Sequence, residues 1–243
     1  MAEHRPLGIV GGLGPSATVF YYMEANNICL RLEGRRPRLL VYSIPFEEMC
    51  GAVRRGDLEG VASLLLEALE SLAGAGVEVA LIAANTPHIA WGLVEPKARS
   101  MGLRLVSIVD AAVEALAALG ARRVAVLATS GTLESRIYHE ALEKRGIEVV
   151  EPPAGEQEWL DRAISESFAP GSPSREDVER LIKLAERLAS ESDAVLVACT
   201  DLSPYMPATV AGKPVVDSSR AQLEKALGEA GFCTRREEPA THV

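Results

Sequence analysis

Short apolar runs alternate along this chain with longer segments whose apolar residues recur every three or four positions. Runs of four or five residues rich in valine, leucine and isoleucine are typical of strands buried on both faces, and the longer segments are typical of helices that pack one face on a sheet. We expect strands at 7–10, 39–43, 79–84, 103–107, 123–128, 147–150, 194–199 and 214–216.

Helix signals fill the intervals between these runs. Asp57 is placed to cap a helix that runs to the glycines at 74 and 76, and Ser174 with Asp177 forms a capping box for a helix ending near Ser190. Further helices are predicted from Val19 onward and over 95–101, 110–120, 133–144, 159–167 and 218–229. The repeated order of strand, helix and strand predicts parallel sheets.

The pattern occurs twice. The segment 123–132 repeats the order found at 7–18, in which a buried strand is followed by glycine and hydroxyl residues and then by a helix. We therefore predict an α/β protein with two pseudo-symmetric doubly wound domains, each with a parallel four-stranded sheet, facing each other across a cleft. The expected first domain comprises 1–101 and 211–243, and the second comprises 102–210.

The chemistry-bearing residues follow two matching strands. The run 194–198 ends in Cys199, Thr200 and Asp201, and the run that starts at 79 ends in Ala84, Asn85 and Thr86. Open α/β sheets bind ligands at the carboxyl ends of their strands, so these two segments are expected to form one site. The two segments differ in one respect, because Ala84 stands at the position that corresponds to the thiol of Cys199.

Composition narrows the function classes. A hydrophobic content of 48% and a charged content of 24% are typical of a globular protein, and the net charge of −9 argues against nucleic acid or an anionic membrane as partner. The chain has no apolar run of about 18 residues and no apolar segment near its start, so we expect a cytoplasmic protein without a membrane span. The four cysteines have no metal-ligand spacing, so neither a zinc site nor a disulfide framework is predicted.

The glycine-rich turn after the first strand is expected to direct backbone amides at an anion. Gly12-x-Gly14-x-x-Ala17 also fits a dinucleotide fingerprint, but no acidic residue ends the next strand, so no cofactor is expected there. Tyr138 is expected to pack in the core. His88 is the one histidine beside the predicted site, with either a capping role or an acid/base role.

Four segments, in this order along the chain, resemble the aspartate/glutamate racemase family. They are GGLGPSAT at 11–18, NTPH at 85–88, TSGT at 129–132 and CTDL at 199–202. The resemblance runs from about Leu7 to Asp217. The wider superfamily also includes hydantoin racemases, maleate isomerases and arylmalonate decarboxylases.

This resemblance implies a cofactor-independent amino-acid racemase, often a homodimer, with a small amino-acid or carboxylate substrate between its domains. Members of the family use two cysteines on opposite faces of the substrate Cα, one after each matching strand, because one group removes a proton and the other delivers one. Cys199 matches the second cysteine, and Ala84 stands in the position of the first. The residues expected to bind substrate are Gly12, Gly14, Ser16, Asn85, Thr86, Ser130, Thr132, Thr200 and Asp201.

Ala84 leaves several interpretations open. It is an engineered change in a two-thiol racemase, or a natural residue whose role passes to Thr86, His88 or water, or the mark of one-thiol chemistry such as that of a decarboxylase or isomerase. A catalytically inactive amino-acid binding protein is a further alternative. The family's arginine and lysine for an acidic side chain also have no clear match here, and Arg54 or Arg55 is the candidate replacement.

Overall fold

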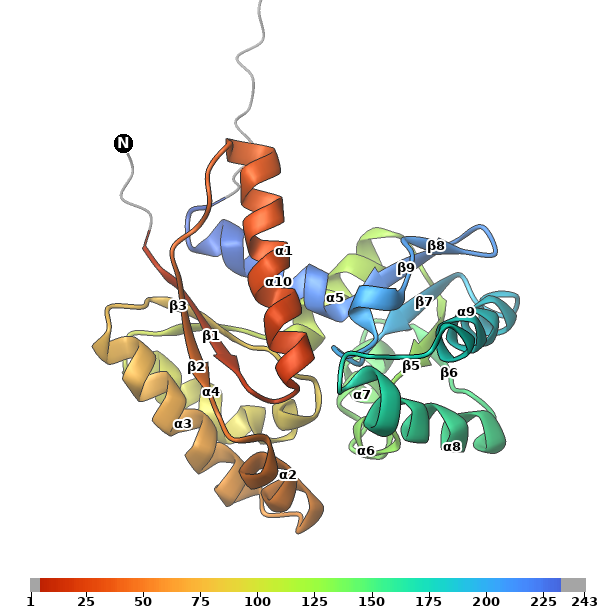
Figure 1. Cartoon of the computed structure of the whole chain (residues 1–243), viewed down its shortest axis with the longest axis horizontal. Helices are drawn as coiled ribbons and strands as arrows, with labels where there is room; N and C mark the ends of the chain where they lie inside the picture. The colour runs from red at the N-terminus through yellow and green to blue at the C-terminus, as the bar shows by residue number, and fades with distance from the viewer. Residues whose placement is uncertain (1–4, 233–243) are drawn as a thin grey trace, which may run out of the picture.

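The computed structural model describes residues 5–232, in which two sheets lie side by side (Figure 1). The first sheet has four parallel strands in the order β2-β1-β3-β4. These strands are β1 (Leu7–Gly11), β2 (Leu39–Ser43), β3 (Val79–Ile82) and β4 (Arg104–Val106). All residues of β1 and β3 are buried, which explains their unbroken apolar sequences.

The second sheet repeats this arrangement and adds an edge strand. Its order is β6-β5-β7-β9-β8, in which the first four strands are parallel and β8 is antiparallel to β9. The strands are β5 (Arg123–Leu127), β6 (Glu148–Val150), β7 (Ala194–Val197), β8 (Thr209–Val210) and β9 (Lys213–Asp217). Strands β3 and β7 therefore occupy equivalent inner positions, and the predicted α/β fold with two similar sheets is confirmed.

Helices cover both faces of each sheet. One face of the first sheet packs against α2 (Phe46–Arg54), α3 (Leu58–Gly74), the 3-10 turn η1 (Thr86–Ala90) and α4 (Trp91–Ser100), and the other packs against α1 (Pro15–Glu33) and α10 (Ser218–Glu229). One face of the second sheet packs against α8 (Ala154–Ala163), the π-helical turn η2 (Ile164–Phe168) and α9 (Arg175–Ala189), and the other packs against α5 (Ile108–Ala118), α6 (Ser130–Glu134) and α7 (Ile137–Glu143). A short 3-10 turn, η3 (Ser203–Tyr205), follows β7.

The predicted helix starts are confirmed at two caps. The side chain of Asp57 accepts a hydrogen bond from the Gly60 amide, and that of Ser174 accepts one from the Asp177 amide. Helix α1 begins at Pro15, because proline fits the first turn of a helix, and the apolar spacing of the helix follows from Val19. Helix α2 forms in a segment for which no helix or strand was predicted.

The sheet pairing also corrects the predicted domain boundaries. Strand β4 was assigned to the second domain, yet it pairs with β3, and Val79 lies opposite Arg104. Strand β9 was assigned to the first domain, yet it pairs with β7, and Val195 lies opposite Val215. The chain therefore crosses from one sheet to the other after β4 and returns after β9, so that α10 packs against α1 and β3.

One cysteine differs from expectation. Cys29 is disulfide-bonded, whereas no disulfide was predicted from the spacing of the cysteines. Cys233 lies outside the described residues. Cys50 and Cys199 are free thiols.

Within residues 5–232, no helix has the length and apolar character that crossing a bilayer requires.

Candidate active site

Ala84 and Cys199 occupy equivalent places in the two sheets. Each lies two residues beyond the end of its strand, β3 or β7. The residues that precede them make matching hydrogen bonds, because Ala83 N donates to Val10 O and Ala198 N donates to Leu127 O, both at 2.8 Å. The structure therefore supports the pairing of Ala84 with Cys199 that the sequence analysis proposed.

Both residues line one cavity of about 360 Å³ between the two sheets. Five other predicted site residues line the same cavity, namely Asn85, Thr86, Thr132, Thr200 and Asp201. Segments that are more than 100 residues apart in the chain meet there because parallel strands place their carboxyl ends at one edge of each sheet.

Cys199 is a buried thiol with 6% of its surface exposed. Burial raises the pKa of Cys199 well above its ordinary value, and the negative charge of Asp201 raises it further. Hydrogen bonds from the amides of Asp201 and Leu202 act in the opposite direction but are outweighed. In the ligand-free protein, Cys199 is therefore a protonated thiol. It can donate a proton in this state, and it must lose that proton before it can act as a base.

Two hydroxyl groups hold the Asn85 side chain in one orientation. Tyr138 Oη donates a hydrogen bond to Asn85 Oδ1 at 2.5 Å, and Ser218 Oγ donates to the same oxygen at 3.4 Å. Burial raises the pKa of Tyr138, so its hydroxyl keeps the proton that it donates. The Asn85 Nδ2 group is buried and has no hydrogen-bond partner among the described residues. Because Asn85 lines the cavity, this amide is a donor in place for a bound carboxylate.

Threonine hydroxyls connect the two halves beside this amide. Thr86 Oγ1 and Thr132 Oγ1 are 3.0 Å apart, and Thr132 Oγ1 is 3.1 Å from Thr129 Oγ1. Thr129 also caps α6, since its side chain accepts a hydrogen bond from the Thr132 amide. Two of the predicted hydroxyls, on Thr86 and Thr132, therefore form a connected chain with Thr129 at the cavity wall.

Asp201 faces the glycine-rich turn from the opposite half. A side chain at Gly14 would place its Cβ 2.7 Å from Asp201 Oδ1, and Gly14 has a φ of 141°, so glycine is required there for two reasons. Asp201 Oδ1 is buried without a partner among the described residues, and burial raises the pKa of Asp201 to about 6. The turn thus faces a carboxylate, which is a poor environment for the phosphate of a dinucleotide.

The raised pKa of Asp201 predicts a pH-dependent cost in stability. The folded protein holds this proton more tightly than the unfolded chain, in which the pKa is near 3.8, so ionisation lowers stability as the pH rises through this range and the full cost is present above about pH 6. Asp201→Asn is therefore expected to be more stable than the unchanged chain at pH 7.5. The difference in unfolding free energy should widen by about 2 kcal/mol between pH 4.5 and pH 7.5.

Urea unfolding of both proteins at the two pH values measures this difference. His88 titrates in both proteins, so its contribution cancels in the comparison. A gap that is the same at pH 4.5 and pH 7.5 would contradict the assignment of a raised pKa to Asp201.

His88 does not serve as the acid/base that the sequence left open. Its Nε2 accepts a hydrogen bond from the Ile108 amide at 3.2 Å, so its Nδ1 is the protonated nitrogen and donates to Ala84 O at 2.9 Å. The ring stacks on Trp91, and burial lowers the pKa of His88 to about 4. Both nitrogens are engaged by the backbone, so His88 anchors the loop after β3 and does not exchange protons with a substrate.

Four other predicted site residues do not line the cavity. Gly12 donates its amide to Thr18 Oγ1 at 2.8 Å, and Ser16 Oγ donates to Ala169 O at 3.0 Å. Ser130 donates its amide and its hydroxyl to Asp161, and Gly14 contacts Asp201 as described. These four residues make contacts next to the cavity without lining it, whereas Leu13 is the residue of the glycine-rich turn that lines the cavity.

One wall of the cavity comes from residues that, apart from Arg54, were not predicted to belong to the site. Helix α2 contributes Phe46, Met49, Cys50, Val53 and Arg54, and the segment around η2 contributes Asp161, Ile164, Ser165 and Ala169. The signal for α2 was present in the helical spacing of its apolar residues. No local signal connected it to the site, because its position depends on packing against α3.

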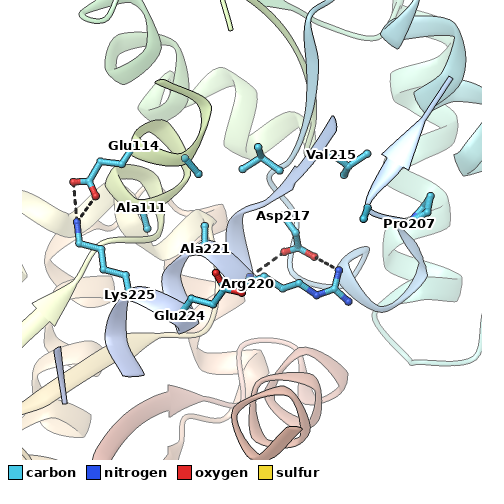
Figure 2. A pocket seen from close by; sticks show the side chains of 12 residues that line it. Ala111, Glu114, Pro207, Val215, Asp217, Arg220, Ala221, Glu224 and Lys225 are labelled. Carbon is cyan, nitrogen blue, oxygen red and sulfur yellow. Dashed lines mark hydrogen bonds and ion pairs between the residues drawn. The ribbon is translucent and has the colours of Figure 1, made fainter. Parts of the chain in front are cut away.

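A second hollow, of about 510 Å³, lies outside the cleft between α5, β9 and α10 (Figure 2). Four of its charged side chains pair with each other, since Lys225 lies 2.6 Å from Glu114 and Arg220 lies 3.7 Å from Asp217. The described residues that line it include no cysteine, serine, threonine or histidine. This hollow therefore offers no thiol, hydroxyl or imidazole, and the smaller cavity, which contains Cys199, remains the candidate. In the part of the chain that the structure describes, no cluster of three or more His, Cys, Asp or Glu is arranged to hold a metal ion.

The chain is similar to known proteins in both sequence and fold. Residues 10–226 match the profile of a family described as Asp/Glu/Hydantoin racemase. The broad specificity amino-acid racemase RacX of Bacillus subtilis (strain 168) is 24% identical over 220 residues, which cover 88% of this chain and 92% of that protein. An aspartate racemase homologue from Pyrococcus horikoshii OT3 is 32% identical with a TM-score of 0.79, covering 93% of this chain and 99% of that one. The maleate isomerase Iso from Pseudomonas putida S16 shares the fold alone, at 15% identity and a TM-score of 0.61 over 94% of this chain and 93% of that one.

Proposed function

Since this chain belongs to the Asp/Glu/Hydantoin racemase family, we propose that it exchanges the Cα proton of an amino acid, with Cys199 as the acid/base on one face of the substrate. The observation that carries the proposal is the arrangement of Cys199 and Ala84 at equivalent strand ends on the same cavity. One thiol and one methyl group then line the cavity at the two positions where two thiols would serve a symmetric racemase.

The residues around the cavity fit the steps of this reaction. The free Asn85 Nδ2 and the hydroxyls of Thr86, Thr132 and Thr200 are donors for the substrate carboxylate, whose negative charge grows when the Cα proton leaves. The α-ammonium of the substrate brings a positive charge into the cavity, and an opposite charge nearby lowers the pKa of a thiol. Substrate binding is therefore expected to convert Cys199 from the resting thiol toward the thiolate that removes the proton.

The second face has no titratable side chain at the position of Ala84. We expect Cys199 to remove and return protons on its own face, which exchanges hydrogen for deuterium without changing configuration. Inversion requires protonation from the other face, where Thr86 and solvent are the available donors, and a hydroxyl or water is a weaker acid than a thiol. Exchange from one enantiomer is thus expected to be faster than net racemisation.

One observation favours a second candidate, a one-thiol decarboxylase or isomerase. Cys199 is protonated in the ligand-free protein, and a reaction that generates a carbanion by losing carbon dioxide needs only a proton donor on one face. A decarboxylase of this kind would act on a malonate-type acid and would not exchange the Cα proton of an amino acid.

Deuterium incorporation at Cα, followed by NMR in D₂O, tests the proposal. Separate L- and D-enantiomers of a panel of amino acids are incubated with the protein, and chiral chromatography reports configuration in parallel. We expect incorporation into one enantiomer to precede the appearance of the other. If no amino acid exchanges and substituted malonates lose carbon dioxide, the decarboxylase replaces the racemase; binding without either reaction supports the amino-acid binding protein.

A further inference from the structure

The wall of the cavity contributed by α2 is apolar apart from Arg54 in the last turn of the helix. Phe46, Met49 and Val53 of α2 line it together with Leu13 from the turn after β1 and Ile164 from η2. The hydroxyl and amide donors lie instead at the strand ends, on Asn85, Thr86, Thr132 and Thr200. A substrate that directs its carboxylate to these donors therefore directs its side chain toward the apolar wall.

The charges that line the cavity disfavour a second carboxylate on the substrate. The lining includes two carboxylates, Asp161 and Asp201, and one cation, Arg54. The Asp161 carboxylate accepts hydrogen bonds from the Ser130 amide, the Ser130 hydroxyl and Gln157 Nε2. The Oδ1 atom of Asp201 is buried and has no hydrogen-bond partner among the described residues. A dicarboxylic amino acid would add a net negative charge to this site, whereas an amino acid with an uncharged side chain enters as a zwitterion.

Arg54 does not offset this imbalance. It lies in the last turn of α2 with its residue exposed to solvent, where screening weakens an ion pair. A carboxylate side chain at the apolar wall would lose its hydrating water and contact methyl, thioether and phenyl groups instead. Burial of the charge there is unfavourable because these groups donate no hydrogen bond to it. The cavity volume of about 360 Å³ is also within the range of about 300–1,000 Å³ that is usual for small-molecule sites, so a side chain larger than that of aspartate fits.

We propose that the substrates of this site are amino acids with large uncharged, apolar side chains, of the leucine, methionine and phenylalanine class, and that aspartate and glutamate are poor substrates. This inference rests on the proposed function, because it assumes that the cavity binds an amino acid. It assigns α2 the role of the specificity wall.

Substrate pairs matched in shape test the proposal directly. Leucine and aspartate have side chains of similar outline that differ in charge, and methionine and glutamate have side chains of similar length that differ in charge. We measure kcat/KM for Cα deuterium exchange with the full chain and expect at least about tenfold higher values for leucine and methionine than for their acidic counterparts.

Substitution of Phe46 then tests the wall. Phe46→Ala is expected to raise KM for leucine and phenylalanine about tenfold and to leave KM for alanine within about twofold, since the alanine side chain is too short to reach α2. Leu58→Ala is the control, because Leu58 is also an exposed apolar residue but begins α3 and does not line the cavity. It should change none of these values.

The outcomes separate the two proposals. If the chain exchanges aspartate or glutamate faster than leucine and methionine, the substrate class is wrong and the proposed function stands. If Phe46→Ala and Leu58→Ala affect leucine equally, α2 is not the specificity wall. If no amino acid of either class exchanges, the proposed function fails, and the substrate class fails with it.

Discussion

Replacing Cys199 with alanine is expected to slow Cα deuterium exchange by about 1,000-fold, because general acid/base groups contribute between about 100- and 10,000-fold to such reactions. Cys199 is the one free thiol at the carboxyl end of an inner strand among the described residues, and with Asp201 it is one of two titratable residues that the segment after β7 contributes to the cavity. The measurement is the rate of deuterium incorporation by NMR with the best substrate of the panel.

Cys50 provides a matched control in the same cavity. It is also a free cysteine, but it lies on α2 and not at a strand end. Cys50→Ser should retain exchange within about tenfold, while Cys199→Ala and Cys199→Ser should both lose it. Equal losses at Cys50 and Cys199 would show that the assignment to Cys199 is incorrect. Retention of near-native unfolding midpoints in both variants excludes misfolding as the cause.

Replacing Ala84 with cysteine is expected to convert slow, one-faced exchange into true racemisation, with interconversion of enantiomers faster by about 100-fold. The introduced thiol would extend from the end of β3 at the place equivalent to that of Cys199 beyond β7, so each face of the substrate Cα would have its own acid/base. Chiral chromatography of the product, run together with deuterium incorporation from each enantiomer, measures the change.

Ala84→Ser distinguishes acid/base chemistry from size. Serine is close to cysteine in shape, but its hydroxyl has too high a pKa to exchange protons efficiently, so this variant should gain less than about tenfold in racemisation. Equal rates for the serine and cysteine variants would mean that position 84 does not deliver protons to the second face. Loss of exchange in both variants would mean that the cavity has no room there.

Sequence reasoning located the carboxyl ends of β3 and β7 to within two residues, because a strand buried on both faces has an unbroken apolar sequence. The expected strands ran to 84 and 199, whereas β3 ends at Ile82 and β7 at Val197, since the two residues after each strand are also apolar and buried. Parallel sheets then bring such ends to one edge, so Asn85, Thr86 and Thr200 could be assigned to the site without coordinates.

The roles of His88 and Tyr138 could not be read in the same way. A histidine next to a predicted site is compatible with catalysis until its two nitrogens are seen to bind Ala84 O and the Ile108 amide. Tyr138 is 53 positions from Asn85 in the chain, and nothing local indicates that its hydroxyl orients the Asn85 amide. Both roles depend on hydrogen bonds between segments that meet only in the folded protein.

The domain boundaries failed for a related reason. The apolar pattern of a strand depends on how deeply the strand is buried and not on which strand lies beside it. The sequences of β4 and β9 therefore do not indicate which sheet each strand joins. Pairing with β3 and β7 decides their places, and it also determines that α10 returns to the first half.

The sequence by itself determined the fold class, the duplicated arrangement of strands and helices, and the pairing of Ala84 with Cys199, since periodicity, capping and strand ends are local properties of the chain. The tertiary structure alone decided the protonation of Cys199, the raised pKa of Asp201, the free amide of Asn85 and the apolar wall on α2. Those properties depend on which groups exclude water from a given atom, and desolvation is set by neighbours that are distant in sequence.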